Sequence, residues 1–199
     1  MKINMEKLHI KTSEDKNNWN EILKLIPKPS SVFLEGENLD FISNVYDSGV
    51  EILYETTGII LGCPRDPRHE VFLETIKKCV KEVFINYDKN FKTYQQKAIK
   101  LLEDNEIKFS VINKVSKIEE IYDLYKLFPE VTQIVIPEVD INQNPLISEK
   151  ELKTETLKYD TKCVKFGFEY YNNLIFDNKQ LIITKDKVDL RPIKIIKIL

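Results

Sequence analysis

The chain has 199 residues, of which 42% are hydrophobic and 31% charged, and its formal net charge is −2. A chain of this length buries enough surface to be stable without a disulfide or a metal. Its 30 basic and 32 acidic residues are mixed along the chain, which argues against nucleic-acid binding. We expect a single domain over residues 1–199, or two intimately packed halves of about residues 1–105 and 106–199.

The sequence favours a cytoplasmic location. The N-terminal residues alternate charged and apolar side chains too quickly for a signal peptide. No apolar run approaches the roughly 20 residues that cross a bilayer. Cys63, Cys79 and Cys163 are spaced too widely for a disulfide framework or a zinc knuckle. These features predict reduced cysteines and no membrane segment, and the abundance of lysine, asparagine and isoleucine favours a bacterial or phage source.

The chain is expected to open with a β-α-β unit. Residues 8–10 alternate apolar and polar side chains, as a half-buried strand does, and residues 14–26 carry apolar side chains at helical spacing. A short apolar strand follows at residues 31–34, and a second helix is expected from about residue 38 to residue 48, before Gly49.

The next segment is expected to form a hairpin and two helices. Two runs rich in β-branched residues flank Thr56-Thr57-Gly58, a pattern typical of a β-hairpin. From Pro67 onward, apolar residues at helical spacing predict a helix that continues to Phe84, and a second helix is expected over about residues 90–105. We expect these two helices to pack as an antiparallel pair.

A second β-α-β unit is expected over residues 107–137. Its helix begins at the capping box Ser116-x-x-Glu119, and its second strand, residues 133–137, is apolar enough for burial on both faces of a parallel pair. Another capping box, Ser148-x-x-Glu151, begins a short helix. Strands are expected afterwards at residues 164–171, 173–176, 181–184 and 193–199. The last has two apolar faces, which predicts an interior strand or, less favoured, an edge buried in a homodimer.

These patterns predict an α+β (mixed α/β) fold, in which helices pack on a mixed sheet that contains β-α-β units and a strand-rich C-terminal part. No dinucleotide or phosphate-loop glycine pattern occurs, and H-E-x-x-H is absent. We therefore expect no cofactor and no metal. The sequence leaves the oligomeric state open.

The segment GCPRDPRHE, residues 62–70, is the one place where residues useful to chemistry gather. Under an enzymatic hypothesis Cys63 is the nucleophile and His69 its base, while Arg65 and Arg68 bind an anion at a helix N-terminus. The cysteine-to-arginine spacing of cysteine-based phosphatases fails by one residue. In the alternative interpretation, the segment only starts a helix.

Under that alternative, Asp66 is the N-cap of a helix that begins at Pro67. Other candidates are weaker patterns. Glu138 and Asp140 follow a buried strand, where α/β sheets place their sites. Three further residues, Asp104, Glu106 and Lys108, resemble loosely the acidic-acidic-lysine arrangement of metal-dependent nucleases. The aromatic group Phe166, Phe168, Tyr170 and Tyr171 is either core or a binding surface.

The first functional hypothesis is a non-catalytic interaction protein with a protein partner, for example a toxin-neutralising (immunity-type) or regulatory protein. It follows from the weakness of the catalytic patterns. The alternative is a small enzyme that acts on a phosphorylated or other anionic substrate through Cys63, His69, Arg65 and Arg68.

Overall fold

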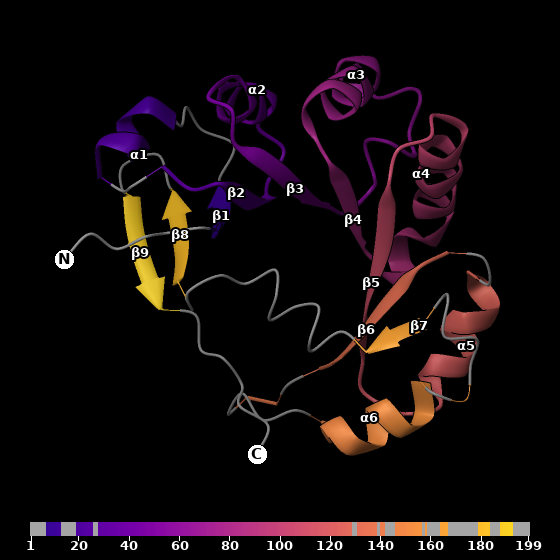
Figure 1. Ribbon diagram of the computed structural model, residues 1–199. Coiled ribbons are helices and arrows are strands. Elements are labelled where there is room, and N and C mark those ends of the chain that lie inside the picture. Colours follow the sequence, from indigo (N-terminus) through magenta and orange to yellow (C-terminus); the bar gives the residue numbers. More distant parts are fainter. Residues whose placement is uncertain are drawn as a thin grey trace.

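The computed structural model describes residues 7–12, 19–25, 28–128, 131–138, 140–141, 146–156, 158, 164–166, 179–183 and 188–192. Within these residues the chain forms one nine-stranded sheet with helices beside it (Figure 1). The strands are β1 (Lys7–Thr12), β2 (Ser31–Glu35), β3 (Glu51–Thr56), β4 (Glu82–Asn86), β5 (Phe109–Val115), β6 (Gln133–Pro137), β7 (Val164–Phe166), β8 (Lys179–Ile183) and β9 (Val188–Pro192). The helices are α1 (Trp19–Leu25), α2 (Leu39–Asp47), α3 (His69–Cys79), the short 3-10 helix η1 (Lys89–Phe91), α4 (Lys92–Asp104), α5 (Glu120–Leu127) and α6 (Glu149–Thr156).

The strands lie side by side in almost the order in which they follow along the chain. The sheet order is β7-β6-β5-β4-β3-β2-β1-β8-β9, and every neighbouring pair is parallel except β8 and β9. The expected mixed sheet with helices packed on it is therefore confirmed. A sequential parallel order of this kind is also the order of strands in (β/α) barrels.

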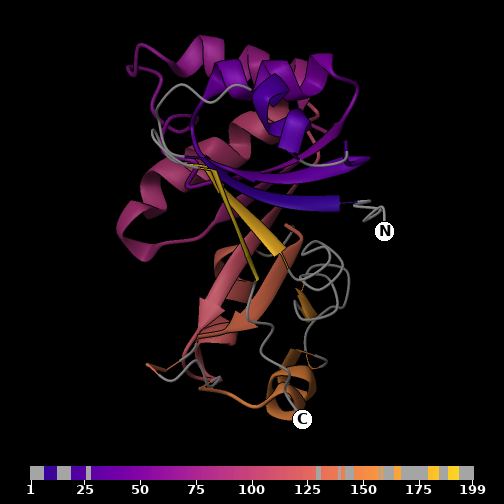
Figure 2. The ribbon, with the colours of Figure 1, turned by 90° about the vertical axis from the view of Figure 1, so that its left-hand side faces the viewer.

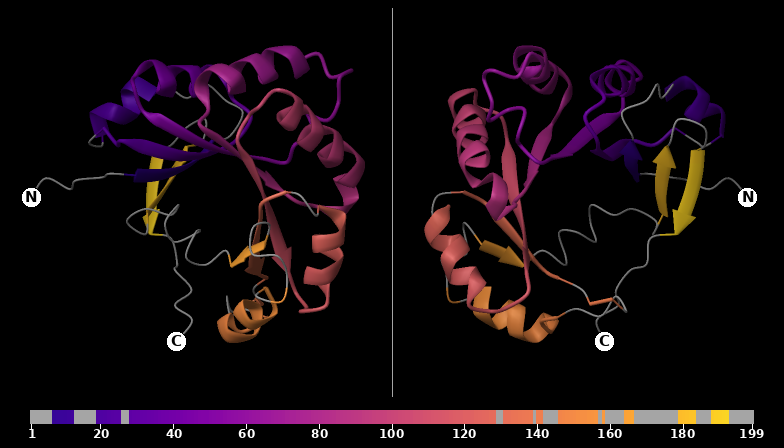
Figure 3. Two further views of the ribbon diagram at one scale, coloured as in Figure 1. Left: turned by 45° about the vertical axis from the view of Figure 1, so that its right-hand side comes forward. Right: turned by 180° about the vertical axis from the view of Figure 1, so that it is seen from behind.

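The described helices all lie on the convex side of the sheet. Crossovers of one hand that always step to the next strand place successive helices on the same face. Helices α1–α3 lie together on one side of strands β1–β3 (Figure 2), and the sheet bends so that α5 and α6 lie outside β5 and β6 (Figure 3). The side chains between sheet and helices form the main core, which includes the fully buried Tyr54, Phe72 and Leu102.

The opposite, concave face of the sheet is also apolar in its middle. Phe33, Phe84, Ile112 and Ile134 form a buried cluster on this face, one from each of β2, β4, β5 and β6. Side chains alternate between the two faces of a strand. The residues two positions farther along these strands therefore also face the concave side, at the carboxyl end of the sheet.

Two expectations for the middle of the chain are wrong. The segment after Thr56 does not return as the second strand of a hairpin, because β3 pairs in parallel with β2 and β4. The helix expected to reach Phe84 ends at Cys79, and Glu82–Asn86 is the buried strand β4. Helices α3 and α4 are consequently separated by a strand, so they are not the antiparallel pair that was expected.

The expectations for both β-α-β units are confirmed. Strands β1 and β2 flank α1, with side-chain capping of α2 by Asn38, and β5 and β6 are parallel neighbours. At Ser148 the reciprocal capping bonds with Glu151 are present. At Ser116 the partner is Glu120, one residue later than expected. The expected strand at residues 193–199 lies outside the described residues, as does most of the aromatic group.

Candidate functional site

A row of polar side chains crosses the concave face where the strands end. Glu35 and Glu55 are register partners at the ends of β2 and β3. Asn86, at the end of β4, shares its face with the buried Ile112. Its Nδ2 donates a hydrogen bond of 2.9 Å to Oε1 of Glu55. Lys114, two residues after Ile112 on β5, continues the row. The carboxyl ends of four neighbouring parallel strands thus bring polar groups to one edge.

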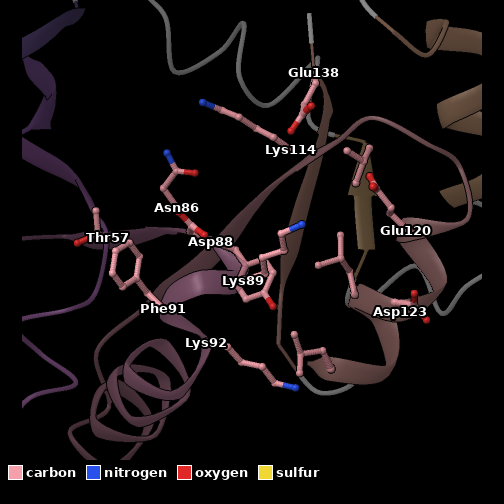
Figure 4. A pocket seen from close by; sticks show the side chains of 14 residues that line it. Thr57, Asn86, Asp88, Lys89, Phe91, Lys92, Lys114, Glu120, Asp123 and Glu138 are labelled. Carbon is pink, nitrogen blue, oxygen red and sulfur yellow. The ribbon is translucent and has the colours of Figure 1, made fainter.

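A cavity of about 750 Å³ opens at this edge (Figure 4). It lies between the segment that follows β4, the end of β5 and helix α5. Its polar lining comes from separate elements and consists of Thr57, Asn86, Asp88, Lys89, Lys92, Lys114, Glu120, Asp123 and Glu138. Tyr87, Phe91, Val115, Leu124 and Leu127 supply its apolar lining. A concave site with apolar walls and a few converging polar groups is the usual form of a small-molecule site.

Three lysines from three elements reach this cavity. Lys89 comes from η1, Lys92 from the first turn of α4 and Lys114 from β5 (Figure 4). None of them forms an ion pair within the part of the chain that the structure describes, whereas Lys100, elsewhere on α4, is bonded to Asp104 at 3.1 Å. Unpaired ammonium groups around a cavity can bind an anion without first breaking an existing ion pair.

Four carboxylates, those of Asp88, Glu120, Asp123 and Glu138, also line the cavity. Burial alone would raise the pKa of Glu120. Hydrogen bonds from the amides of Ser116 and Lys117, with a further bond from the Ser116 hydroxyl, outweigh it and hold the pKa of Glu120 below its ordinary value. This carboxylate is therefore charged at neutral pH and is occupied in capping α5. In Figure 4 Asp123 lies on the same side as Glu120, whereas Glu138 lies beside Lys114.

A smaller cavity of about 250 Å³ continues along the same edge. It is lined by Glu35, Glu37 and Glu55 and shares Thr57 and Asn86 with the larger cavity. Thr57 and Asn86 therefore lie where the two cavities meet: the larger is lined by both lysines and carboxylates, and the charged lining of the smaller consists of carboxylates.

The residues of the 62–70 segment are not in the lining of either cavity, although Arg68 contacts Glu37, which lines the smaller one. His69 is buried at the start of α3, and its Nδ1 donates a hydrogen bond of 3.0 Å to the carbonyl oxygen of Ile60. Cys63 is half-buried. Among the described residues it makes no hydrogen bond to His69. The nucleophile and base of the enzymatic hypothesis are thus not brought into the contact that such a pair needs.

The two arginines of this segment also do not converge on a cavity. Arg68 makes a bidentate pair with Asp66, at 2.9 and 3.0 Å, and reaches Glu37 at 3.3 Å. Arg65 is exposed. Helix α3 begins at His69, two residues later than expected, and Asp66 Oδ1 accepts a hydrogen bond from the amide of Arg68. The expectation that Asp66 is the N-cap is therefore wrong: Arg68 holds that position without a side-chain capping bond, and the Asp66 carboxylate bonds the amide two residues on, as in an Asx-turn.

Of the other candidates, Glu138 lines the larger cavity, and the lining does not include Asp140. The nuclease-like group is dispersed: Asp104 pairs with Lys100, and Lys108 pairs with Glu82 at 2.6 Å. Within the described residues, no group of three or more histidine, cysteine or acidic side chains is arranged to hold a metal ion. None of the helices described is long and apolar enough to cross a membrane.

In comparisons with known proteins, no family model matches the chain and no curated protein matches its sequence.

Proposed function

We propose that the chain binds a small polar metabolite that carries a phosphate or carboxylate group, in the cavity at the carboxyl edge of the sheet. The observation that carries the proposal is the convergence of three lysines, Lys89, Lys92 and Lys114, on one cavity of about 750 Å³, with no ion pair to any of them among the residues that the structure describes. Parallel β/α sheets place their ligands at this edge, because the loops that follow the strands gather there.

The other groups that line the cavity narrow the chemical class of the ligand. The N-terminal end of α4 borders the cavity at Lys92, and the partial positive charge of a helix N-terminus adds to the charge of the lysines. Asp123 and Glu138 accept hydrogen bonds only, so they favour a ligand that also carries hydroxyl or amino groups. The fitting class is thus a phosphorylated or carboxylated metabolite with hydrogen-bond donors at its other end.

This proposal keeps the anionic ligand of the enzymatic hypothesis but moves it to other residues. Roles for Cys63, His69, Arg65 and Arg68 stay predictions, as do a cytoplasmic location and a bacterial source. The proposal concerns binding and assigns no catalytic step.

Titration of the purified chain with pyrophosphate and with ribose 5-phosphate tests the proposal, using calorimetry or NMR. The Lys114→Gln variant removes one charge from the cavity, and Lys100→Gln removes one from the outer surface of the same protein. A hydrogen bond to a charged group contributes about 1.5–3 kcal/mol, so Lys114→Gln should weaken binding by roughly 10- to 100-fold. Lys100→Gln should bind as the parent does. Equal affinities for the two variants, or no binding by the parent chain, would contradict the proposal.

A second candidate is the interaction protein with a protein partner. The observation in its favour is that three aromatic side chains near the cavity, Phe91, Tyr94 and Tyr122, are 37–48% exposed. Aromatic side chains are enriched at protein interfaces. Co-purification from the native host with mass spectrometry tests this candidate: a stoichiometric partner that is lost in Phe91→Ser and Tyr94→Ser supports it, and recovery of the chain alone argues against it.

A further inference from the structure

Gln95 on α4 is a fully buried polar side chain at the base of the two loops that line the cavity. Its exposed fraction is 0%. Its Nε2 donates two hydrogen bonds of 2.8 Å, one to the carbonyl oxygen of Thr57 and one to that of Asn86. Its Oε1 accepts a bond of 3.1 Å from the amide of Asp88. One side chain thus satisfies main-chain groups of both the β3–α3 loop and the β4–α4 loop.

The β3–α3 loop touches α4 at further points, so Gln95 is part of a longer contact. Gly58 has a φ of +75°, and a Cβ there would lie 3.4 Å from Cβ of Ala98. Gly62 lies directly against the main chain of Tyr94. The loop from Thr57 to Gly62 therefore lies along the first two turns of α4, and Gln95 adds a hydrogen bond to this contact through the carbonyl oxygen of Thr57.

The β4–α4 loop depends on Gln95 in a second way. The amide of Asp88 is bonded to Gln95, and the carboxylate of Asp88 accepts a hydrogen bond of 2.8 Å from the amide of Asn90. This bond caps η1, the turn that carries Lys89 into the cavity (Figure 4). A shift of Gln95 is thus passed through Asp88 to Lys89.

We propose that Gln95 is the positioning residue of the cavity: it holds Thr57, Asn86 and Asp88 at a fixed spacing and so sets the geometry in which an anionic ligand meets Lys89 and Lys114. The inference rests on the proposed function, because it names what organises that same site. Gln95 itself is buried behind the loops and does not line the cavity.

The test compares Gln95→Met with two controls on the same helix. Gln96→Met makes the same change at the neighbouring, exposed glutamine, and Leu102→Ala destabilises α4 from a fully buried position away from both loops. Pyrophosphate is the probe. Gln95→Met should bind it at least about tenfold more weakly than the parent, the loss of more than one ordinary hydrogen bond. At a temperature where Leu102→Ala is folded, both control variants should bind pyrophosphate as tightly as the parent does.

A conservative variant separates positioning from folding. In Gln95→Glu an ionised carboxylate would face the carbonyl oxygens of Thr57 and Asn86, and protonation restores one donor. Burial raises the pKa of a carboxyl group, so the affinity of Gln95→Glu relative to Gln96→Glu should recover as the pH falls from about 8 to about 5. This comparison also decides the question if Gln95→Met does not fold. An affinity ratio that stays constant across pH would overturn the inference.

The experiments distinguish failure of the proposed function from failure of the role proposed for Gln95. If the parent chain binds no probe, the proposed function is wrong, and amide hydrogen exchange then decides whether Gln95 positions the loops. Exchange should accelerate at residues 57–62 and 87–91 together in Gln95→Met and not in Leu102→Ala. If the parent binds and Gln95→Met binds equally well, the site stands and the role of Gln95 is refuted.

Discussion

Gly62 lies so close to Tyr94 that no side chain fits between them: a Cβ built on Gly62 would be 1.9 Å from the main-chain carbonyl oxygen of Tyr94. The contact joins the middle of the β3–α3 loop to the first turn of α4. It explains why glycine stands at this position, where φ is not in the left-handed region. The requirement is one of space, because the two main chains approach each other directly.

The first prediction follows from this contact. Gly62→Ala should force the loop away from α4 and lower the free energy of unfolding by about 1–3 kcal/mol, as overpacking does. Chemical denaturation measures the change. Arg65→Ala, three residues along the same loop at an exposed position, should change stability by less than about 0.5 kcal/mol. If both variants unfold at the same denaturant concentration, the close contact does not constrain the loop.

A second prediction concerns a buried amide pair beneath α5. Nδ2 of Asn113 donates a hydrogen bond of 2.9 Å to Oε1 of Gln133, and Nε2 of Gln133 donates to the carbonyl oxygens of Leu124 and Phe128. Gln133→Met would leave these groups without partners, at about 1–3 kcal/mol for a buried unsatisfied group. Thermal unfolding should show a clear loss of stability, while Gln96→Met, at an exposed site, should show none. An unchanged melting temperature in Gln133→Met would mean that water replaces the amide.

The third prediction is a pH dependence. The side-chain hydrogen bond from Arg68, with its amide bond, holds the pKa of Asp66 below its ordinary value. A carboxyl with a depressed folded-state pKa stabilises the protein above its unfolded pKa of about 3.9 and loses that contribution as the pH falls through the folded pKa. Asp66→Asn should therefore be less stable than the parent at neutral pH, and the difference should shrink below about pH 4.

The partner residue supplies the control for that measurement. In an Arg68→Ala background the Asp66→Asn change should have a smaller effect at neutral pH, because the ion pair is already gone. Denaturation midpoints of the four proteins across pH give both comparisons. A difference between Asp66→Asn and the parent that does not vary with pH would refute the assigned cause.

The fourth prediction separates two cysteines. Cys79 is 5% exposed, and burial raises the pKa of its thiol, whereas Cys63 is half-buried. Because the thiolate is the reactive form, iodoacetamide should modify Cys79 more slowly than Cys63 in single-cysteine variants at neutral pH. The two rates should converge in denaturant. A folded-state rate at Cys63 no higher than at Cys79 would also remove the enzymatic hypothesis for the 62–70 segment.

Capping residues in the sequence correctly predict where two of the helices begin. Asn38 caps α2, and Ser148 with Glu151 begins α6, because capping needs only nearby groups. Hydrophobic spacing gives a wrong prediction where one apolar segment covers both a helix and the strand after it. Helical spacing from Val71 to Phe84 is equally compatible with a helix followed by a buried strand, since a strand covered on both faces carries no alternation.

Because residues 82–84 are predicted as helix instead of strand, most residues of the cavity are missed from the sequence. The rule that ligands meet the ends of parallel strands led to Glu138, which lines the cavity, because β6 was recognised as a strand. Asn86 and Lys89 follow β4, whose apolar residues also fit helical spacing, so the rule for strand ends does not lead to them from the sequence alone. One feature of the sequence does indicate this part of the site: the polar residue Asn86 directly follows the apolar segment Val83–Ile85. The residue types of the 62–70 segment suggest a site, but residue types alone do not determine which side chains converge in the folded chain.

The sequential strand order has a consequence for how the chain acquires its structure. From β1 to β7, each strand pairs with the one made just before it, so the sheet can grow unit by unit during synthesis without long-range searching. The pairing of β1 with β8 joins segments about 170 residues apart and must wait until nearly the whole chain has emerged. In a ribosome-release experiment, protease protection should therefore advance in steps from the N-terminal units onward, with the protection of β1 completed last.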